Sequence, residues 1–156
     1  MNKIALFVPK LDGGGAERVF VDYANGLAEL DYDVHLICLE GGSYESGLAT
    51  EVTLHVLDTR MRKAFYPLWK CLRSIRPEIL LSGLTGANVL AVLVGRAARV
   101  PAVWVSVHND LSSEDAVRNA VFGRMEIRLI RFAAQRADGV IAVSQGVSKF
   151  LTHDLS

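Results

Sequence analysis

The sequence predicts an α/β fold in which a mainly parallel sheet is covered by helices on both faces. Short apolar runs of strand length, most of them rich in β-branched residues, alternate along the chain with segments of helical periodicity. Strands that alternate with helices form βαβ units, and such units pair their strands in parallel. The strand candidates are residues 4–8, 34–39, 52–57, 79–81, 102–107 and 140–143.

Helical periodicities fill most of the gaps between these runs. Residues 16–30 place Val19, Phe20, Tyr23, Ala24, Leu27 and Leu30 on one face. The pattern recurs at Leu68, Leu72 and Ile75, over residues 89–98, and at Val121, Met125, Leu129 and Phe132. No linker, low-complexity stretch or internal repeat interrupts the alternation. We therefore expect residues 1–156 to form one Rossmann-like, doubly wound domain.

The composition indicates a globular domain in a reducing compartment. Hydrophobic residues make up 51% of the chain and charged residues 22%, which is enough apolar material for one well-buried core. Basic and acidic residues both number 17, so no net charge favours nucleic acid as a partner. Cys38 and Cys71 lack the spacing of a metal site or a disulfide framework. The apolar run at 4–8 is too short for an export signal, so we expect a cytoplasmic protein.

One uncharged segment, residues 79–95, approaches the length of a membrane span. Ser82, Gly83, Thr85, Gly86 and Asn88 interrupt it with a turn-like cluster. We therefore expect a strand, a turn and a helix here rather than a span.

Three glycines, Gly13, Gly14 and Gly15, fall between the first predicted strand and the first predicted helix. At this edge of an open α/β sheet ligands bind, and we expect positive φ and close approach of a phosphate to the backbone. A glycine-rich turn with nothing bound remains the alternative. A dinucleotide fingerprint would need a small residue where Arg18 stands, and no phosphate loop of the G-x-x-x-x-G-K-[ST] type exists.

Three stretches, in this order, resemble one enzyme family. They are GGGAERVFVDYANGLAELDYDVHLICLE (13–40), VWVSVHND (103–110) and RADGVIAVSQGVSKFL (136–151). They are similar to the N-terminal half of the retaining GT-B glycosyltransferases of the GT4 group. The resemblance implies that residues 1–156 form the acceptor-side domain. It also implies a second, donor-binding Rossmann-like domain with a Glu-x₇-Glu motif, which is absent from this chain.

The resemblance assigns roles to residues near the predicted sheet edge. Gly13, Gly14 and Gly15 match the loop that closes over the diphosphate and sugar of the donor, a UDP- or GDP-linked sugar. His108 matches the family histidine that touches the transferred sugar, and its alternative role is to cap a strand end. Asn109, Asp110 and Arg18 are candidates for contact with the acceptor, although Asn109 and Asp110 are equally suited to a turn. No cofactor is expected, and no H-x-x-H or D-x-D motif predicts a metal site.

Other polar residues receive structural roles. We expect Ser144 to cap the helix after residue 143, and Glu17 to favour the dipole of the first helix. His35, His55 and His153 are assigned no chemistry.

Residues 60–76 combine basic and aromatic side chains and contain no acidic residue. The basic ones are Arg60, Arg62, Lys63, Lys70, Arg73 and Arg76, and Phe65, Tyr66 and Trp69 lie among them. Leu68, Leu72 and Ile75 are expected to face the core while Trp69, Lys70, Arg73 and Arg76 point away, toward an anionic membrane surface or a lipid pyrophosphate. Arg124, Arg128 and Arg131 repeat the stripe on a later helix. An ordinary solvated helix face is the alternative.

These observations predict the N-terminal domain of a nucleotide-sugar-dependent retaining glycosyltransferase, a hexosyl- or N-acetylhexosaminyltransferase. The expected acceptor is a lipid-linked cell-envelope saccharide, such as a precursor of lipopolysaccharide, capsule or exopolysaccharide. The enzyme would be cytoplasmic and peripheral on the inner face of the plasma membrane, and residues 1–156 alone are expected to be inactive. Two alternatives stay open: a non-catalytic Rossmann-like module that binds a nucleotide or a partner, and an NAD-dependent oxidoreductase using Glu40, which Arg18 disfavours.

Overall fold

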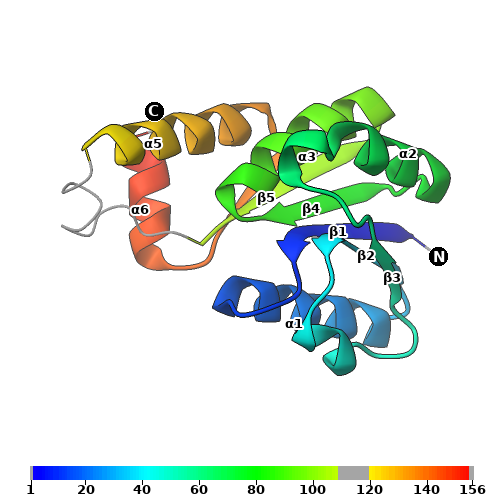
Figure 1. The fold of residues 1–156 in the computed structure, drawn as a ribbon. Helices are drawn as coiled ribbons and strands as arrows, with labels where there is room; N and C mark the ends of the chain where they lie inside the picture. The colour runs from blue at the N-terminus through cyan, green and yellow to red at the C-terminus, as the bar shows by residue number, and fades with distance from the viewer. Residues whose placement is uncertain (1, 109–119, 155–156) are drawn as a thin grey trace.

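The computed structural model describes residues 2–108 and 120–154, which form a sheet with helices on both faces (Figure 1). The strands are β1 (Lys3–Lys10), β2 (Asp33–Glu40), β3 (Thr53–Val56), β4 (Ile79–Gly83), β5 (Ala102–Val107) and β6 (Gly139–Ala142). The helices are α1 (Gly15–Glu29), α2 (Phe65–Ile75), α3 (Thr85–Ala98), α5 (Ala120–Arg136) and α6 (Gln145–Asp154). Two short 3-10 helices, η1 (Ser43–Gly47) and η2 (Met61–Lys63), follow β2 and β3. Each predicted strand is present, with its ends shifted by at most two residues.

The sheet is parallel throughout and has the strand order β3-β2-β1-β4-β5-β6. β1 is central: its Ala5 pairs with His35 of β2 on one side and with Leu80 of β4 on the other. The chain runs outward from β1 to β3 and then crosses to β4, so the strand order reverses between β1 and β4. The predicted fold class is confirmed. Its switch point, where open parallel sheets bind ligands, lies between the carboxyl ends of β1 and β4.

Two hydrophobic cores cover the two faces of the sheet. Leu6 and Val8 of β1 point into a core with Phe20 of α1. Phe7, the residue between them, points into the other core, which α2, α3 and part of α5 cover. This alternation follows from the two-residue period of a strand. Because both faces of the sheet are buried, the sequences of the central strands are nearly continuous runs of apolar residues.

The two cysteines lie in these cores as free thiols. Burial raises the pKa of Cys38 to about 12, with a further contribution from Glu45, and burial raises the pKa of Cys71 to about 11. Both thiols are therefore protonated and unreactive at neutral pH.

The uncharged segment 79–95 forms β4 and most of α3, as expected. Within residues 2–108 and 120–154, no helix has the length and apolar character needed to cross a membrane.

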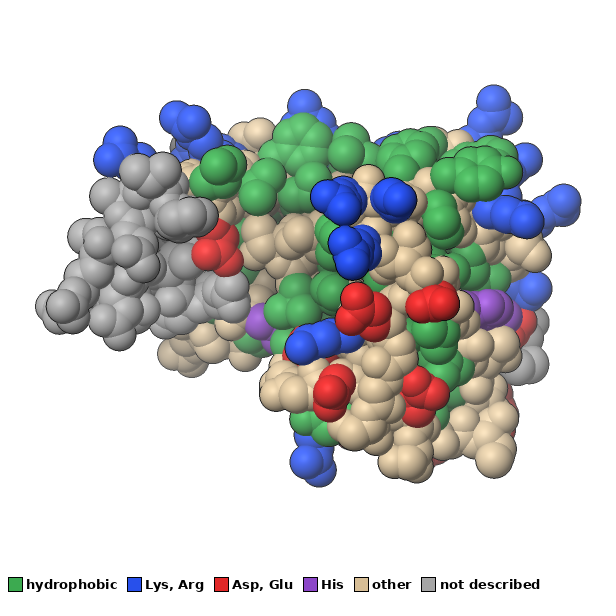
Figure 2. All heavy atoms as spheres, viewed as in Figure 1, with side chains coloured by type: hydrophobic (Ala, Val, Ile, Leu, Met, Phe, Trp, Pro, Cys, Tyr) green, Lys and Arg blue, Asp and Glu red, His purple; other side chains and the backbone are tan. Residues whose placement is uncertain are grey.

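The helices on the two faces of the sheet differ in charge. The described helices α2, α3 and α5 contain Lys70, Arg73, Arg96, Arg124, Arg128, Arg131 and Arg136 against one acidic residue, Glu126. On the other face, α1 and η1 contain Glu17, Asp22, Glu29 and Glu45 against Arg18. Figure 2 shows basic side chains along the upper rim of the molecule, where Figure 1 places α2, α3 and α5, and most of the visible acidic side chains lie below them.

Candidate functional site

The candidate site lies where β1, β4 and β5 end beside the amino terminus of α1. Gly13, in the turn after β1, has a φ of 75° and is the one glycine of the described residues with positive φ. Glycine adopts this left-handed region without strain. A Cβ added to Gly13 or Gly15 would meet no atom within 4 Å. Both glycines therefore face open space, and their backbone is accessible to a ligand.

Gly14 differs from what the sequence predicted. Its φ of −115° and ψ of 154° are extended backbone that any residue adopts, so the expectation of positive φ is wrong at this position. A larger residue is disfavoured for another reason, because the carboxylate of Glu17 occupies the place that a Cβ on Gly14 would take.

Glu17 lies in the first turn of α1 and is only 6% exposed. The positive end of the helix dipole stabilises a carboxylate in this position, as expected. The same helix end was assigned to a phosphate. The carboxylate of Glu17 therefore already occupies part of the helix end that the sequence assigns to a phosphate, and Gly13 and Gly15 face the open space beside it.

His108 directly follows β5 and is half-buried. Its Nε2 lies 3.0 Å from Oγ of Ser106, and its ring centroid lies 6.1 Å from that of Phe20 on α1. Burial lowers the pKa of His108, and the negative charge of Glu17 acts in the opposite direction. The structure thus brings His108 near α1 and its first turn, at the edge where open parallel sheets form a ligand crevice outside the carboxyl ends of their strands.

The β4 side of the crevice is built closely around Phe20. A Cβ on Gly83, the last residue of β4, would collide with the Phe20 ring. The next residue, Leu84, has a φ of 74° and a ψ of 139°, which is a genuine outlier for a bulky residue. Such strain is characteristic of functional sites.

Beneath the crevice, three buried polar residues form a chain of hydrogen bonds. Ser82 of β4 donates to Oδ1 of Asn88 on α3 at 2.6 Å, and Nδ2 of Asn88 donates to the carbonyl oxygen of Ser106 on β5 at 2.9 Å. Sequence reasoning used Ser82 and Asn88 as turn residues and missed this chain, because their pairing across the fold leaves no mark in the sequence.

Of the three residues predicted to contact the acceptor, the structure describes one. Arg18 is exposed on the first turn of α1. Asn109 and Asp110 lie outside the described residues.

Comparison with known families decides the relationship of the chain. The sequence profile of Glycosyltransferase Family 4 matches residues 13–155. The chain belongs to this family.

Two curated relatives are similar to the chain over part of their length. Over 122 residues, the chain is 26% identical to a Campylobacter jejuni enzyme named GalNAc-alpha-(1->4)-GalNAc-alpha-(1->3)-diNAcBac-PP-undecaprenol alpha-1,4-N-acetyl-D-galactosaminyltransferase. This alignment covers 70% of the chain and 33% of the relative. Over 104 residues it is 27% identical to an uncharacterised glycosyltransferase of Haemophilus influenzae, covering 64% of this chain and 30% of the relative. The GT4 chain thus spans about a third of the length of these curated relatives.

Among solved structures, the GT4 chain is similar to sucrose-phosphate synthase from Thermosynechococcus elongatus. The superposition has a TM-score of 0.71 at 15% identity, and it covers 100% of this chain and 46% of the other. At this identity the similarity establishes the fold alone.

The basic stripe of the GT4 chain lies on α2, and it only partly matches the prediction. Leu68, Leu72 and Ile75 are buried as expected, and Lys70, Arg73 and Arg76 are exposed. Trp69 does not point away from the core. It is half-buried against α3, its indole nitrogen donates to the carbonyl oxygen of Ala97 at 3.4 Å, and its ring stacks on Tyr66 with centroids 5.9 Å apart. Tyr66 is the more exposed aromatic, at 66%.

The far end of the stripe, at Arg73 and Arg76, and the crevice lie at different edges of the sheet. α2 begins after β3, at the carboxyl edge, and ends where Nζ of Lys3, at the start of β1, donates to the carbonyl oxygen of Ile75. An 11-residue helix is about 16 Å long. Arg73 and Arg76 are therefore not brought together with His108.

A smaller expectation concerns the start of α6. The hydroxyl of Ser144 accepts a hydrogen bond from the amide of Val147 at 3.2 Å, so the predicted cap of α6 is confirmed. Among residues 2–108 and 120–154, no group of three or more His, Cys, Asp or Glu side chains is placed to hold a metal ion.

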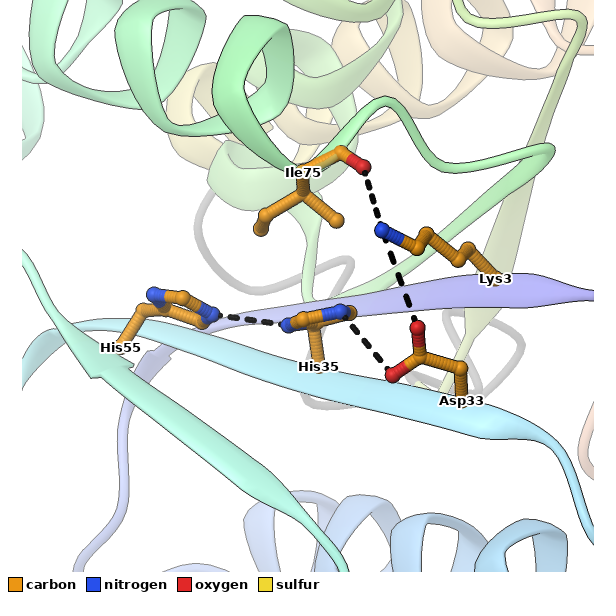
Figure 3. A network of polar contacts seen from close by, with 5 residues as sticks. All are labelled: Lys3, Asp33, His35, His55 and Ile75. Atoms are coloured by element: carbon orange, nitrogen blue, oxygen red, sulfur yellow. Dashed lines mark hydrogen bonds and ion pairs between the residues drawn. The ribbon is translucent and has the colours of Figure 1, made fainter. Parts of the chain in front are cut away.

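His35 and His55, to which no chemistry is assigned from the sequence, form a pair that joins β2 and β3 near α2 (Figure 3). Nδ1 of His35 lies 2.9 Å from Nε2 of His55. Oδ1 of Asp33 lies 3.2 Å from Nε2 of His35 but outside hydrogen-bond geometry, so this buried nitrogen has an electrostatic contact and no hydrogen bond. Asp33 also pairs with Lys3 at 3.8 Å. Burial lowers the pKa of both histidines.

Proposed function

We propose that this GT4 chain forms the acceptor-side domain of a retaining glycosyltransferase, which moves a sugar from a UDP- or GDP-linked donor to a lipid-linked cell-envelope saccharide. The observation that carries the proposal is the position of His108, which follows β5 next to the switch-point strand β4 and lies against Phe20 of α1, close enough to Glu17 of the first turn to feel its charge. Family membership supports glycosyl transfer over the oxidoreductase and binding-module alternatives.

Each residue of the crevice has a role in the proposed reaction. Transfer breaks the bond between the anomeric carbon and the donor diphosphate and forms a bond to an acceptor hydroxyl oxygen on the same face of the sugar. The nucleoside diphosphate leaves and takes up the proton of that hydroxyl. The amides of Gly13 and Gly15 contact the diphosphate, whereas the amide of Gly14 donates to the carbonyl oxygen of Asp12 at 3.1 Å. His108 contacts the sugar, where charge develops in the transition state.

Acceptor hydroxyls would be bound by Arg18, Asn109 and Asp110. No metal cofactor is included in the proposal, because backbone amides and basic groups can neutralise the leaving diphosphate. A second, donor-binding domain would select the base and the sugar.

The acceptor class is inferred from a relative and from the charge on one helix layer. The Campylobacter jejuni relative acts, by its name, on a saccharide linked to undecaprenol through a pyrophosphate. The exposed Lys70, Arg73 and Arg76, together with the exposed rings of Phe65 and Tyr66, suit contact with an anionic membrane surface. This supports a cytoplasmic enzyme held at the inner face of the membrane. Because Arg76 and His108 lie at opposite edges, the stripe suits the membrane surface better than the pyrophosphate of a reacting acceptor.

The test uses the longest natural protein that carries this chain. We expect it to transfer label from UDP- or GDP-sugars to lipid in a membrane extract, and we expect residues 1–156 alone to give no sustained turnover. His108→Ala should lower kcat with the fold intact, because the lost contact is made as charge develops. His55→Gln, on the edge strand β3, is the matched histidine control. Absence of transfer across a panel of donors and extracts would overturn the proposal.

A further inference from the structure

We propose that Ser106 is a positioning residue that fixes His108 as the tautomer with its proton on Nδ1. The inference rests on the proposed function in one respect, the contact between His108 and a sugar. The geometry from which it starts is independent of that function.

The first step is the anchoring of Ser106 itself. Ser82 and Ser106 are 0% exposed and Asn88 is 3% exposed, so these groups depend on one another for hydrogen bonds. An amide oxygen only accepts and an amide nitrogen only donates. Asn88 therefore accepts a hydrogen bond from the Ser82 hydroxyl through Oδ1 and donates one through Nδ2 to the carbonyl oxygen of Ser106. A buried polar network whose members are satisfied is rigid, and it holds the end of β5 in place.

The second step concerns the proton of the Ser106 hydroxyl. Among the described residues, its Oγ has one hydrogen-bond partner, Nε2 of His108 at 3.0 Å. If Nε2 carried a proton, the hydroxyl could only accept, and its own proton would be buried without an acceptor, which costs free energy. The favourable arrangement has the hydroxyl donating to an unprotonated Nε2. The proton of the neutral ring is then on Nδ1.

The third step is what this tautomer offers a ligand. Burial lowers the pKa of His108 and favours the neutral ring, in which the two nitrogens have different roles. With Nε2 occupied by Ser106, the Nδ1–H group is a donor that no described residue uses. The complementary ligand group is an acceptor oxygen, such as a sugar hydroxyl or ring oxygen. Without Ser106, the ring is free to take the Nε2–H form that predominates in free histidine.

The experiment measures the tautomer directly, by long-range ¹H–¹⁵N NMR of the imidazole rings in the ¹⁵N-labelled chain. His108→Gln assigns the His108 signals by their loss. We expect the Nδ1–H pattern in the wild type and in Ser106→Thr, which keeps the hydroxyl. Ser106→Ala should convert the ring to the Nε2–H form or to a mixture. If Ser106→Ala does not fold, the wild-type spectrum still shows which tautomer His108 adopts.

A matched control removes a serine hydroxyl at the same edge of the sheet without touching His108. Ser144→Ala deletes the cap of α6 and should leave the His108 pattern unchanged. An Nε2–H pattern in the wild type, an unchanged pattern in Ser106→Ala, or a changed pattern in Ser144→Ala would each overturn the proposal.

A kinetic comparison in the longer protein separates positioning from simple destabilisation. Ser106→Ala should lower kcat about tenfold, the effect of one hydrogen bond, with the donor KM changed less than about twofold. Ser106→Thr should restore kcat. Failure of the wild type to transfer any sugar would overturn the proposed function and leave the tautomer result standing. Normal kcat in Ser106→Ala would overturn the positioning role alone.

Discussion

Leu84 holds a backbone conformation that is costly for any residue with a side chain. Its φ of 74° lies at the switch point, between β4 and the first turn of α3. Glycine usually destabilises relative to alanine, but at positive φ the order reverses. We predict that Leu84→Gly is more stable than Leu84→Ala by about 1 kcal/mol. Urea unfolding of the two variants measures the difference. Because both variants lose the same leucine contacts, an alanine variant of equal or greater stability would show that Leu84 is not strained.

The glycines at this edge are not equivalent. A Cβ on Gly42, before η1, would meet the backbone carbonyl oxygen of Leu11, whereas a Cβ on Gly14 would meet the flexible carboxylate of Glu17. A carboxylate can move aside more easily than backbone. We predict that Gly42→Ala lowers the free energy of unfolding by about 2 kcal/mol and Gly14→Ala by about 1 kcal/mol or less.

A double-mutant cycle tests the reason given for Gly14. In a Glu17→Ala background, Gly14→Ala should have a smaller cost, because the side chain that it displaces is absent. An equal cost in both backgrounds would contradict the assigned contact.

At single positions, the sequence predicted where the site lies better than it predicted how the site is built. The run of three glycines placed a turn between the first strand and the first helix, at the carboxyl edge where the candidate site lies. It did not show that Gly13 alone needs positive φ, or that Glu17 folds over Gly14. It also did not single out Gly42. These features depend on contacts between side chains and backbone that only the folded chain brings together.

At the scale of elements, α2 offers a direct test of membrane contact. Reversing Lys70, Arg73 and Arg76 to Glu should abolish binding to anionic vesicles, because each cation near such a surface contributes roughly 1 kcal/mol. The side chains are exposed, so the fold should be retained. Co-sedimentation at low and high salt measures the effect, which should weaken as salt shortens the screening length.

The matched control reverses two cations on the opposite side of the sheet, Lys10 and Arg18. Vesicle binding should survive this change. Equal loss in both variants would mean that the overall charge, and not α2, governs the attraction.

The observed ends of the strands lie within two residues of the predicted ends. The agreement is close because a strand buried on both faces is a continuous run of apolar residues, and turn residues bound each run. Side-chain directions followed the sequence less well. On α5, the predicted inner residues Met125 and Leu129 are exposed, and Ile130 and Ala133 are buried instead.

Trp69 is the more instructive case. The helical period predicted that Trp69 lies beside Lys70 on the outward face of α2. Its ring instead packs toward α3, and its indole nitrogen donates to the carbonyl oxygen of Ala97. Helical spacing predicts the direction in which a side chain leaves the helix. It does not predict how far a long side chain bends toward a neighbouring helix.

At the scale of the whole molecule, the histidine pair predicts a loss of stability in acid. Burial lowers the folded-state pKa of His35 and His55 below 6.5, while Asp33 opposes the shift at His35. The unfolded chain therefore binds more protons than the folded chain as pH falls through this range, and stability falls with it. Protonation of both rings also sets two N–H groups against each other across 2.9 Å.

We expect the free energy of unfolding to decrease between about pH 7.5 and about pH 5. The double variant His35→Gln, His55→Gln should show a smaller decrease, with a residual contribution from His108, whose pKa burial also lowers. Denaturant titrations across this pH range measure the slope. An equal slope in the wild type and the double variant would contradict a role for the pair.

The separation of charge between the two helix layers has a consequence for how the molecule meets a surface. The formal net charge is zero, with 17 basic and 17 acidic residues, so attraction to an anionic bilayer comes from the electric dipole and not from the total charge. In the membrane contact proposed above, the field of the bilayer would turn the approaching molecule within a Debye length, about 8 Å at physiological salt, so that the layer of α2, α3 and α5 faces the surface. That layer is parallel to the sheet. A molecule docked in this way has the edge of its sheet, and therefore the crevice at His108, opening along the plane of the bilayer, where the head groups of lipid-linked molecules diffuse.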